Sequence, residues 1–115
     1  MSKDILFLLP PGFKDNDRRE FCPECAELWG VLSYYPAIKE ALEIRYVGIK
    51  HPRGPICDLL GEGNWNAPTL VLVPENTGFA SRGLGESNGY SHLGSARAIA
   101  AYFSTRFGTA MPRGS

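Results

Sequence analysis

The sequence of 115 residues is short of several residue types, and each shortage argues against a class of protein. It has three cysteines and two histidines, and an odd cysteine count argues against a framework of structural disulfides. Twelve Lys and Arg residues balance twelve Asp and Glu residues. The net charge therefore gives no indication of a nucleic-acid partner or of a charged membrane surface, and we expect neither.

Long apolar runs are scarce as well. The run at residues 5–9 ends in two prolines, and it is too short for a membrane span or a signal peptide. We expect a cytoplasmic protein without a membrane partner, in a compartment that keeps thiols reduced. The chain has 43% hydrophobic and 21% charged residues, which predicts one globular domain over 1–115, with its core at about 4–108 and a tail at 109–115.

The spacing of apolar residues and the positions of proline and glycine predict the secondary structure. In chain order we expect a strand at 4–9, a helix at 23–35, a short helix at 36–42, a strand at 43–49, a short helix at 53–63, a strand at 67–73 and a helix at 95–108. Between the last two we place a short strand near 79–82, in a hairpin with 69–73. This order predicts an α/β sandwich around a small mixed sheet.

The segment between the first strand and the first cysteine is polar. Its basic residues are Lys14, Arg18 and Arg19, and they are interleaved with the acidic residues Asp15, Asp17 and Glu20. Such alternation of sign is typical of a solvated surface. We interpret the segment as a solvated loop in preference to an anion site.

Two cysteines stand two residues apart in REFCPECAELWG (19–30), at the start of the first long helix. Unpaired N–H groups and the positive end of the helix dipole favour the thiolate form of a cysteine in that place, and Pro23 suits the first turn. Cys22 is then the candidate nucleophile and Cys25 the resolving thiol. Glu24 works partly against this, because a carboxylate disfavours a second negative charge beside it.

Two other interpretations of the cysteine pair stay open. Both thiols can be unreactive residues at a helix edge, or they can belong to a zinc site. Zinc needs four ligands, and the only further candidates are Cys57, His51 and His92, with no second C-x-x-C. We expect Cys57 to be a small core residue and both histidines to lie in loops, so we expect no metal.

The order of elements, with FCPEC opening the first helix and APTLVLV forming the third strand, resembles the thioredoxin-like superfamily. The C-P-x-C form is closer to glutaredoxins than to thioredoxin. The resemblance implies a βαβαββα sandwich and a thiol–disulfide oxidoreductase that needs no prosthetic group. More narrowly, the chain is similar to small bacterial proteins of unknown function that begin with DILFLL-x-PGF, a group that brings a fold and no established activity.

The resemblance also implies a set of substrate-binding residues. Pro68 corresponds to the cis-proline of the superfamily, which faces the cysteine pair. Ala67 then offers its backbone to an extended peptide or to glutathione. Phe21 and Pro23 flank the first cysteine, and Thr69 follows the proline. The implied partner is a disulfide-containing protein or glutathione, the latter as a co-substrate.

The end of the chain also resembles the N-terminal domain of glutathione transferases, where an acidic residue and a serine before the final helix hold the glutamyl end of glutathione. The counterparts here are GES at 85–87 and GSARAIAAYF at 94–103. Ser91 or Ser95 is more simply the N-cap of the last helix.

Two rival readings complete the expectations. The same groove can serve a redox-inactive binding module for a protein partner or for glutathione. Exposed aromatic residues can also form a homodimer contact, and the candidates are Trp29, Tyr34, Tyr35 and Trp65.

Overall fold

The structure, a computed structural model, describes residues 1–114 of the chain. In chain order its elements are β1 (Asp4–Leu8), β2 (Phe13–Asp15), β3 (Arg18–Glu20), α1 (Pro23–Tyr34), the 3-10 helix η1 (Pro36–Ala41), β4 (Leu42–Tyr46), α2 (Gly54–Leu60), β5 (Thr69–Leu72), the 3-10 helix η2 (Pro74–Phe79), β6 (Leu84–Ser87), β7 (Tyr90–Leu93) and α3 (Ala96–Phe107). The α/β class predicted from the sequence is confirmed. No helix within the described residues is both long and apolar enough to cross a membrane.

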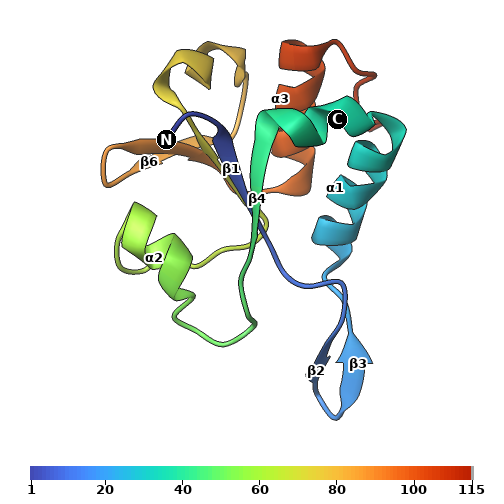
Figure 1. The fold of residues 1–115 in the computed structure, drawn as a ribbon, viewed down its shortest axis with the longest axis vertical. Coiled ribbons are helices and arrows are strands. Elements are labelled where there is room, and N and C mark those ends of the chain that lie inside the picture. Colours follow the sequence, from blue (N-terminus) through green and yellow to red (C-terminus); the bar gives the residue numbers. More distant parts are fainter. Residues whose placement is uncertain (115) are drawn as a thin grey trace.

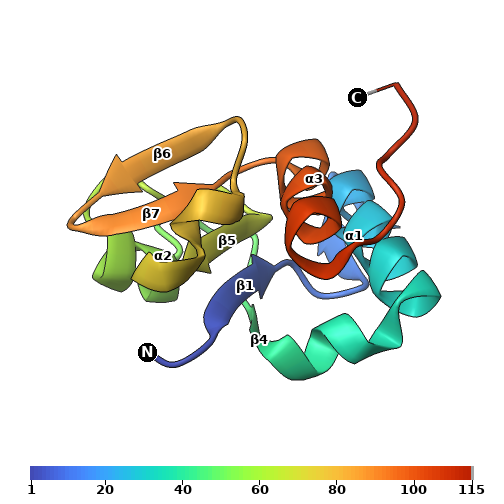
Figure 2. The same ribbon diagram turned by 90° about the horizontal axis from the view of Figure 1, so that it is seen from above.

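Five strands form the central sheet, in the order β4-β1-β5-β7-β6. β1 runs parallel to β4, whereas the pairs β1–β5, β5–β7 and β6–β7 are antiparallel. Helices α1 and α3 lie side by side on one face of the sheet, and α2 lies on the other face (Figures 1 and 2). The predicted sandwich around a mixed sheet is therefore confirmed.

The core is built around β1, which has helices on both sides. All five of its residues are buried, as expected of a continuous apolar run in a central strand. Leu28 and Leu32 of α1 and Tyr102 and Phe103 of α3 are completely buried against it. Each such side chain contributes roughly 1.5–3 kcal/mol by leaving water, so β1 and the two long helices form the stable centre of the fold.

The strand predicted near 79–82, and its hairpin with 69–73, are wrong. Residues 74–79 form the 3-10 helix η2, which begins at a proline and is tied by a hydrogen bond from Thr77 Oγ1 to the Pro74 carbonyl, 3.0 Å. The chain therefore turns away from the sheet after β5 instead of folding back along it.

The strand that pairs with β5 is β7, and β7 comes from a hairpin with β6. Its two-residue turn is Asn88-Gly89, with φ angles of 52° and 81°. An Asn-Gly pair is the residue combination that a tight hairpin turn with two positive φ angles prefers. His92 lies in this hairpin, on β7, so the expectation that it lies in a loop is wrong.

The polar segment expected to be a solvated loop is a second hairpin. β2 and β3 pair across the turn Asn16-Asp17, whose φ angles are 53° and 58°. Asn and Asp tolerate this left-handed conformation better than other residues with a side chain. The hairpin projects from the body of the molecule beyond the end of β1 (Figure 1).

Two other segments can be described in more detail. The helix predicted at 36–42 is present as the 3-10 helix η1. The tail expected at 109–115 folds back along the two long helices (Figure 2), where the Ala110 N–H donates to the Tyr35 hydroxyl at 3.3 Å and Arg97 donates to the Arg113 carbonyl at 2.9 Å. Residue 115 lies outside the described residues.

Candidate functional site

Cys22 is the N-cap of α1, as the sequence predicts. Its backbone is extended, and its Sγ accepts the N–H of Cys25 at 3.2 Å. The sulfur therefore takes the place that a serine or aspartate oxygen usually fills at a helix start. Pro23 occupies the first helical position, where it has no N–H to leave unpaired. Cys22 is partly exposed and lines a groove on the surface.

Cys25 lies one turn further into α1 and is 4% exposed. Its Sγ accepts the N–H of Leu9, the residue after β1, at 3.4 Å. Burial raises the pKa of the Cys25 thiol to about 12, and the hydrogen bond with Cys22 acts in the same direction. The pair thus joins a partly exposed sulfur to a buried thiol that holds its proton at neutral pH.

A groove of about 260 Å³ adjoins the two cysteines. It is lined by Leu9, Pro10, Pro11, Phe21, Cys22, Cys25, Ala26 and Trp29. These side chains are almost all apolar, and Phe21 is 60% exposed at the rim. We call this the cysteine groove. Of the substrate-binding residues predicted from the sequence, Phe21 is the one that lines it beside Cys22.

Pro68 lies at the same edge of the sheet as the cysteine pair. The register opposes Phe7 of β1 to Thr69 of β5, so Pro68 stands beside the end of β1, close to the residue whose N–H reaches Cys25. Pro68 is buried and Ala67 is half-buried. The peptide bond between them is cis, which confirms the predicted conformation.

Thr69 was also predicted to bind substrate, but its side chain is hydrogen-bonded to Asn66 and does not line the cysteine groove. Its Oγ1 donates to the Asn66 carbonyl at 2.7 Å and accepts from Asn66 Nδ2 at 3.1 Å. Thr69 lines a separate cavity of about 320 Å³, together with residues of α2, β6 and β7. The structure therefore places Thr69 on the edge that holds the cysteines without bringing its side chain into the cysteine groove.

Glu24 has a role that the sequence did not reveal. Its Oε1 accepts the N–H of Ala96, the first residue of α3, at 2.9 Å. The N-cap of α3 is Ser95, whose Oγ accepts the Ala98 N–H at 3.2 Å, which settles the choice between Ser91 and Ser95. A carboxylate at a helix N-terminus is favourable, so the charge of Glu24 is directed to α3 and ties the two helices together.

The remaining candidate metal ligands lie apart from the cysteine pair. Cys57 is half-buried rather than in the core, and its Sγ donates to the Asn64 carbonyl at 3.2 Å. His51 stacks on Trp65 with ring centroids 5.2 Å apart. Among residues 1–114, no three His, Cys, Asp or Glu side chains gather in a way that can hold a metal ion.

The segment compared with the glutathione transferases lies on β6. Ser87 Oγ is 3.1 Å from Nε2 of His92 and donates to Asn64 Oδ1 at 3.3 Å. Burial lowers the pKa of His92, so its ring is neutral at pH 7. The serine of this segment is therefore engaged within the sheet and does not cap the final helix.

The four aromatic residues considered for a dimer contact are not equally available. Tyr34 is 82% and Trp65 is 41% exposed, whereas Trp29 and Tyr35 are half-buried. Trp29 lines the cysteine groove. Tyr34 and Trp65 lie on α1 and before β5, respectively, so the four residues do not make one exposed cluster.

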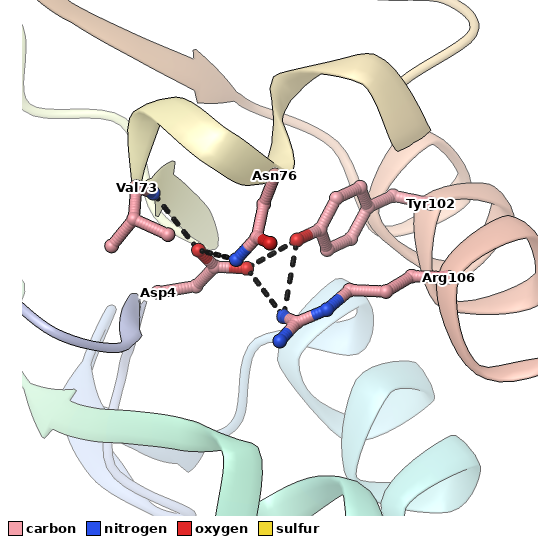
Figure 3. Close-up of polar contacts among 5 residues, drawn as sticks. All are labelled: Asp4, Val73, Asn76, Tyr102 and Arg106. Atoms are coloured by element: carbon pink, nitrogen blue, oxygen red, sulfur yellow. Dashed lines mark hydrogen bonds and ion pairs between the residues drawn. The ribbon is translucent and has the colours of Figure 1, made fainter.

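A second polar centre lies at the start of β1, and Figure 3 shows it. Asp4 is completely buried. Its Oδ1 accepts the Val73 N–H at 2.9 Å and Asn76 Nδ2 at 3.0 Å. Its Oδ2 accepts the Tyr102 hydroxyl and Arg106 Nη1, the latter at 2.9 Å. Burial raises the pKa of Tyr102. Both carboxylate oxygens are satisfied, so this centre is closed and structural.

Comparison with known proteins identifies a family and no activity. No curated protein matches the chain, and no solved structure matches it either. Residues 3–111 match the model of a family described as "Protein of unknown function (DUF3088)". Because this match covers nearly the whole sequence, the chain belongs to the DUF3088 family.

Proposed function

We propose that this protein is a thiol–disulfide oxidoreductase of the thioredoxin-like type, with Cys22 as the nucleophile and Cys25 as the resolving thiol. One observation carries the proposal: a partly exposed cysteine caps the N-terminus of α1 and accepts the N–H of a second, buried cysteine at 3.2 Å. Helix N-termini favour a thiolate. The strand order around β1, with the cysteine helix α1 following β1 after the β2–β3 hairpin, supports the superfamily assignment.

The proposed reaction has two exchange steps. The Cys22 thiolate attacks one sulfur of the substrate disulfide and forms a mixed disulfide, while the other substrate sulfur leaves with the electron pair and takes a proton from water. Cys25 then loses its proton to solvent and attacks the sulfur of Cys22. The substrate leaves as a thiol, and the protein is left oxidised with a Cys22–Cys25 disulfide. A thiol reductant such as glutathione reverses this oxidation.

Binding would use both sides of the cysteine pair. The cysteine groove accepts an apolar side chain of the substrate beside Cys22, with Phe21 as its exposed rim. Ala67 and Pro68, at the same sheet edge, would offer backbone to an extended peptide or to glutathione. Both steps are direct exchanges between thiols and disulfides, so no prosthetic group is required. The chemistry suits the cytoplasm, where thiols are kept reduced.

Reduction of insulin and of a glutathione mixed disulfide tests the proposal. We expect the wild type to reduce both substrates in the presence of a thiol reductant. Cys22→Ser should fall to the uncatalysed background, because serine keeps the helix cap and removes the nucleophile. Cys25→Ser should retain the attack and accumulate the mixed disulfide on Cys22. Equal activity of the wild type and Cys22→Ser would overturn the proposal.

The alternative is a redox-inactive binding module that uses the same groove. One observation favours it: burial raises the pKa of Cys25 to about 12, which slows the resolving step. Mass spectrometry after mild oxidation separates the two functions. A Cys22–Cys25 disulfide that forms and is reduced again by dithiothreitol supports the oxidoreductase, whereas two thiols that stay reduced support the binding module.

A further inference from the structure

Two positively charged residues stand directly opposite each other on one face of the β2–β3 hairpin. The antiparallel register sets Lys14 directly opposite Arg19, and both residues are exposed. Like charges at directly opposed positions destabilise a strand pair. Among residues 1–114 neither side chain forms an ion pair. We call Lys14 and Arg19 the cationic pair.

Two of the three acidic side chains of the hairpin, those of Asp15 and Glu20, lie on its other face, and the third, Asp17, lies in the turn. Strand alternation places Asp15, Arg18 and Glu20 together on the face opposite the cationic pair. Glu20 Oε2 accepts Arg18 Nε at 2.6 Å, and this hydrogen bond lowers the pKa of Glu20. Asp15 Oδ1 accepts the N–H of Asn16 at 3.1 Å. The face that carries Lys14 and Arg19 therefore holds no carboxylate from β2 or β3, although the hairpin as a whole is neutral, with three basic and three acidic residues.

The cationic pair is close to the cysteines along the chain and across the surface. Arg19 precedes Cys22 by three residues, so their Cα atoms are at most about 11 Å apart. A shallow hollow of about 440 Å³ is lined by Arg18, Arg19, Glu20 and Phe21. Phe21 also lines the cysteine groove. A molecule bound beside Cys22 would therefore lie within reach of the hairpin.

From these observations we infer that the β2–β3 hairpin is a docking arm for an acidic segment of the protein whose disulfide reacts with Cys22. This inference rests on the proposed function and names its substrate class: a protein disulfide with Asp or Glu residues a few positions from the reacting cysteine. The cationic pair binds the carboxylates, and their binding relieves the repulsion within the hairpin. The groove beside Phe21 takes the apolar residues next to the cysteine.

Three peptides test the inference. Each carries one cysteine in a disulfide with 2-mercaptoethanol, flanked on both sides by two Glu, two Gln or two Lys residues. In the Cys25→Ser protein the reaction stops at a Cys22–peptide disulfide, with mercaptoethanol leaving as the thiol, and mass spectrometry gives its rate. Rates with dithiothreitol, a neutral thiol, correct for the reactivity of each peptide.

We expect the Glu peptide to react about 10-fold faster than the Lys peptide at low salt, because opposite charges steer association. The difference should disappear near 1 M salt, where screening acts over about 3 Å. Lys14→Gln with Arg19→Gln should bring the ratio to about one, whereas Arg19→Lys should preserve most of it. Lys3→Gln is the control, because it removes one exposed positive charge at the other end of β1.

Equal corrected rates for the Glu and Lys peptides would overturn the docking arm, as would a preference that survives loss of the cationic pair. Reaction of the Gln peptide with Cys22 shows in either case that the proposed chemistry holds. If no peptide reacts, the proposed function fails. Fluorescence anisotropy with labelled peptides that carry serine for cysteine then decides the docking arm alone: tighter binding of the Glu peptide supports it, and equal binding overturns it.

Discussion

Polar groups at the two ends of β1 lie in opposite environments. At its start, Asp4 is completely buried, and four donors satisfy its two oxygens (Figure 3). Just past its other end, the N–H of Leu9 donates to the Cys25 sulfur at 3.4 Å, and Cys22 is partly exposed. Sulfur is a weak acceptor. The first end is therefore closed and stabilising, and the second is open and available for chemistry.

This difference follows from what each end connects. Asp4 binds the backbone of Val73, the side chain of Asn76 on η2, and two residues of α3. The carboxylate thus fixes three parts of the chain that are far apart in sequence. The cysteine pair is formed within one turn of α1 and capped by its own sulfur. The hydrogen bonds to the two cysteine sulfurs therefore join nearer parts of the chain than those to the Asp4 carboxylate do.

The largest expected effect is at the closed end. Asp4→Ala should lower the free energy of unfolding by about 3–5 kcal/mol, because breaking a buried pair leaves the other charge uncompensated. It also leaves the Val73 N–H and the Tyr102 hydroxyl without their acceptor. Urea unfolding followed by circular dichroism measures the change. A loss under about 1 kcal/mol would show that the network contributes little.

A double variant separates the charge from the hydrogen bonds. Asp4→Ala combined with Arg106→Met removes both partners of the ion pair, in which Asp4 is buried and Arg106 is partly exposed. Residues that share a network are not additive, so the double variant should lose less stability than the sum of the two single variants. Strict additivity would mean that Asp4 and Arg106 act independently, and the description of this end as one closed network would be wrong.

The sequence predicts well those parts of the fold that local patterns determine. β1 is a run of apolar residues, α1 follows a C-P start, and α3 lies between a Ser cap and a Gly stop. The hairpin of β6 and β7 was missed, although Asn88-Gly89 is a strong hairpin signal. The 3-10 helix η2 replaces the predicted hairpin with 79–82, and its contact between Asn76 and Asp4 joins residues 72 positions apart.

The same division holds for the candidate site. The cap at Cys22 and the cis bond at Pro68 follow from local motifs or from the resemblance. The contact of Glu24 with Ala96 does not, since it joins two helices 72 residues apart. The direction of the Thr69 side chain is not predictable either, because it depends on Asn66 and the packing of the neighbouring strands.

An effect of intermediate size on the free energy of unfolding is expected at alkaline pH, where Cys25 near one end of β1 can be compared with Tyr102 near the other. Burial raises the pKa of Cys25 from 9.0 to about 12. A raised pKa means that the folded state holds the proton more tightly. The resulting stabilisation is complete below about pH 9 and is lost as pH rises towards 12. Tyr102 at the closed end shifts in the same direction from 10.0, so its contribution is lost at higher pH.

Unfolding free energies between pH 8 and pH 11 measure this effect. Cys25→Ala should flatten the decline that begins near pH 9, and Tyr102→Phe should leave that first part unchanged. If Cys25→Ala declines as steeply as the wild type over this range, the Cys25 thiol is not the group responsible, and the open end is less well buried at Cys25 than its 4% exposure indicates.

The smallest effect on the free energy of unfolding is expected from Glu24→Gln, a change beside the cysteine pair. The charge of Glu24 lies at the N-terminus of α3, where such a charge contributes about 0.3–1 kcal/mol. The same change removes a negative charge two residues from Cys22, so Cys22 should be alkylated faster.

Glu27→Gln is the matched control, because it breaks the exposed Glu27–Arg97 ion pair, for which about 0.2–1 kcal/mol is usual. Both variants should lose similar stability, and only Glu24→Gln should change the iodoacetamide rate. Equal rates in both variants would show that α3 holds the Glu24 charge too firmly for it to act on Cys22.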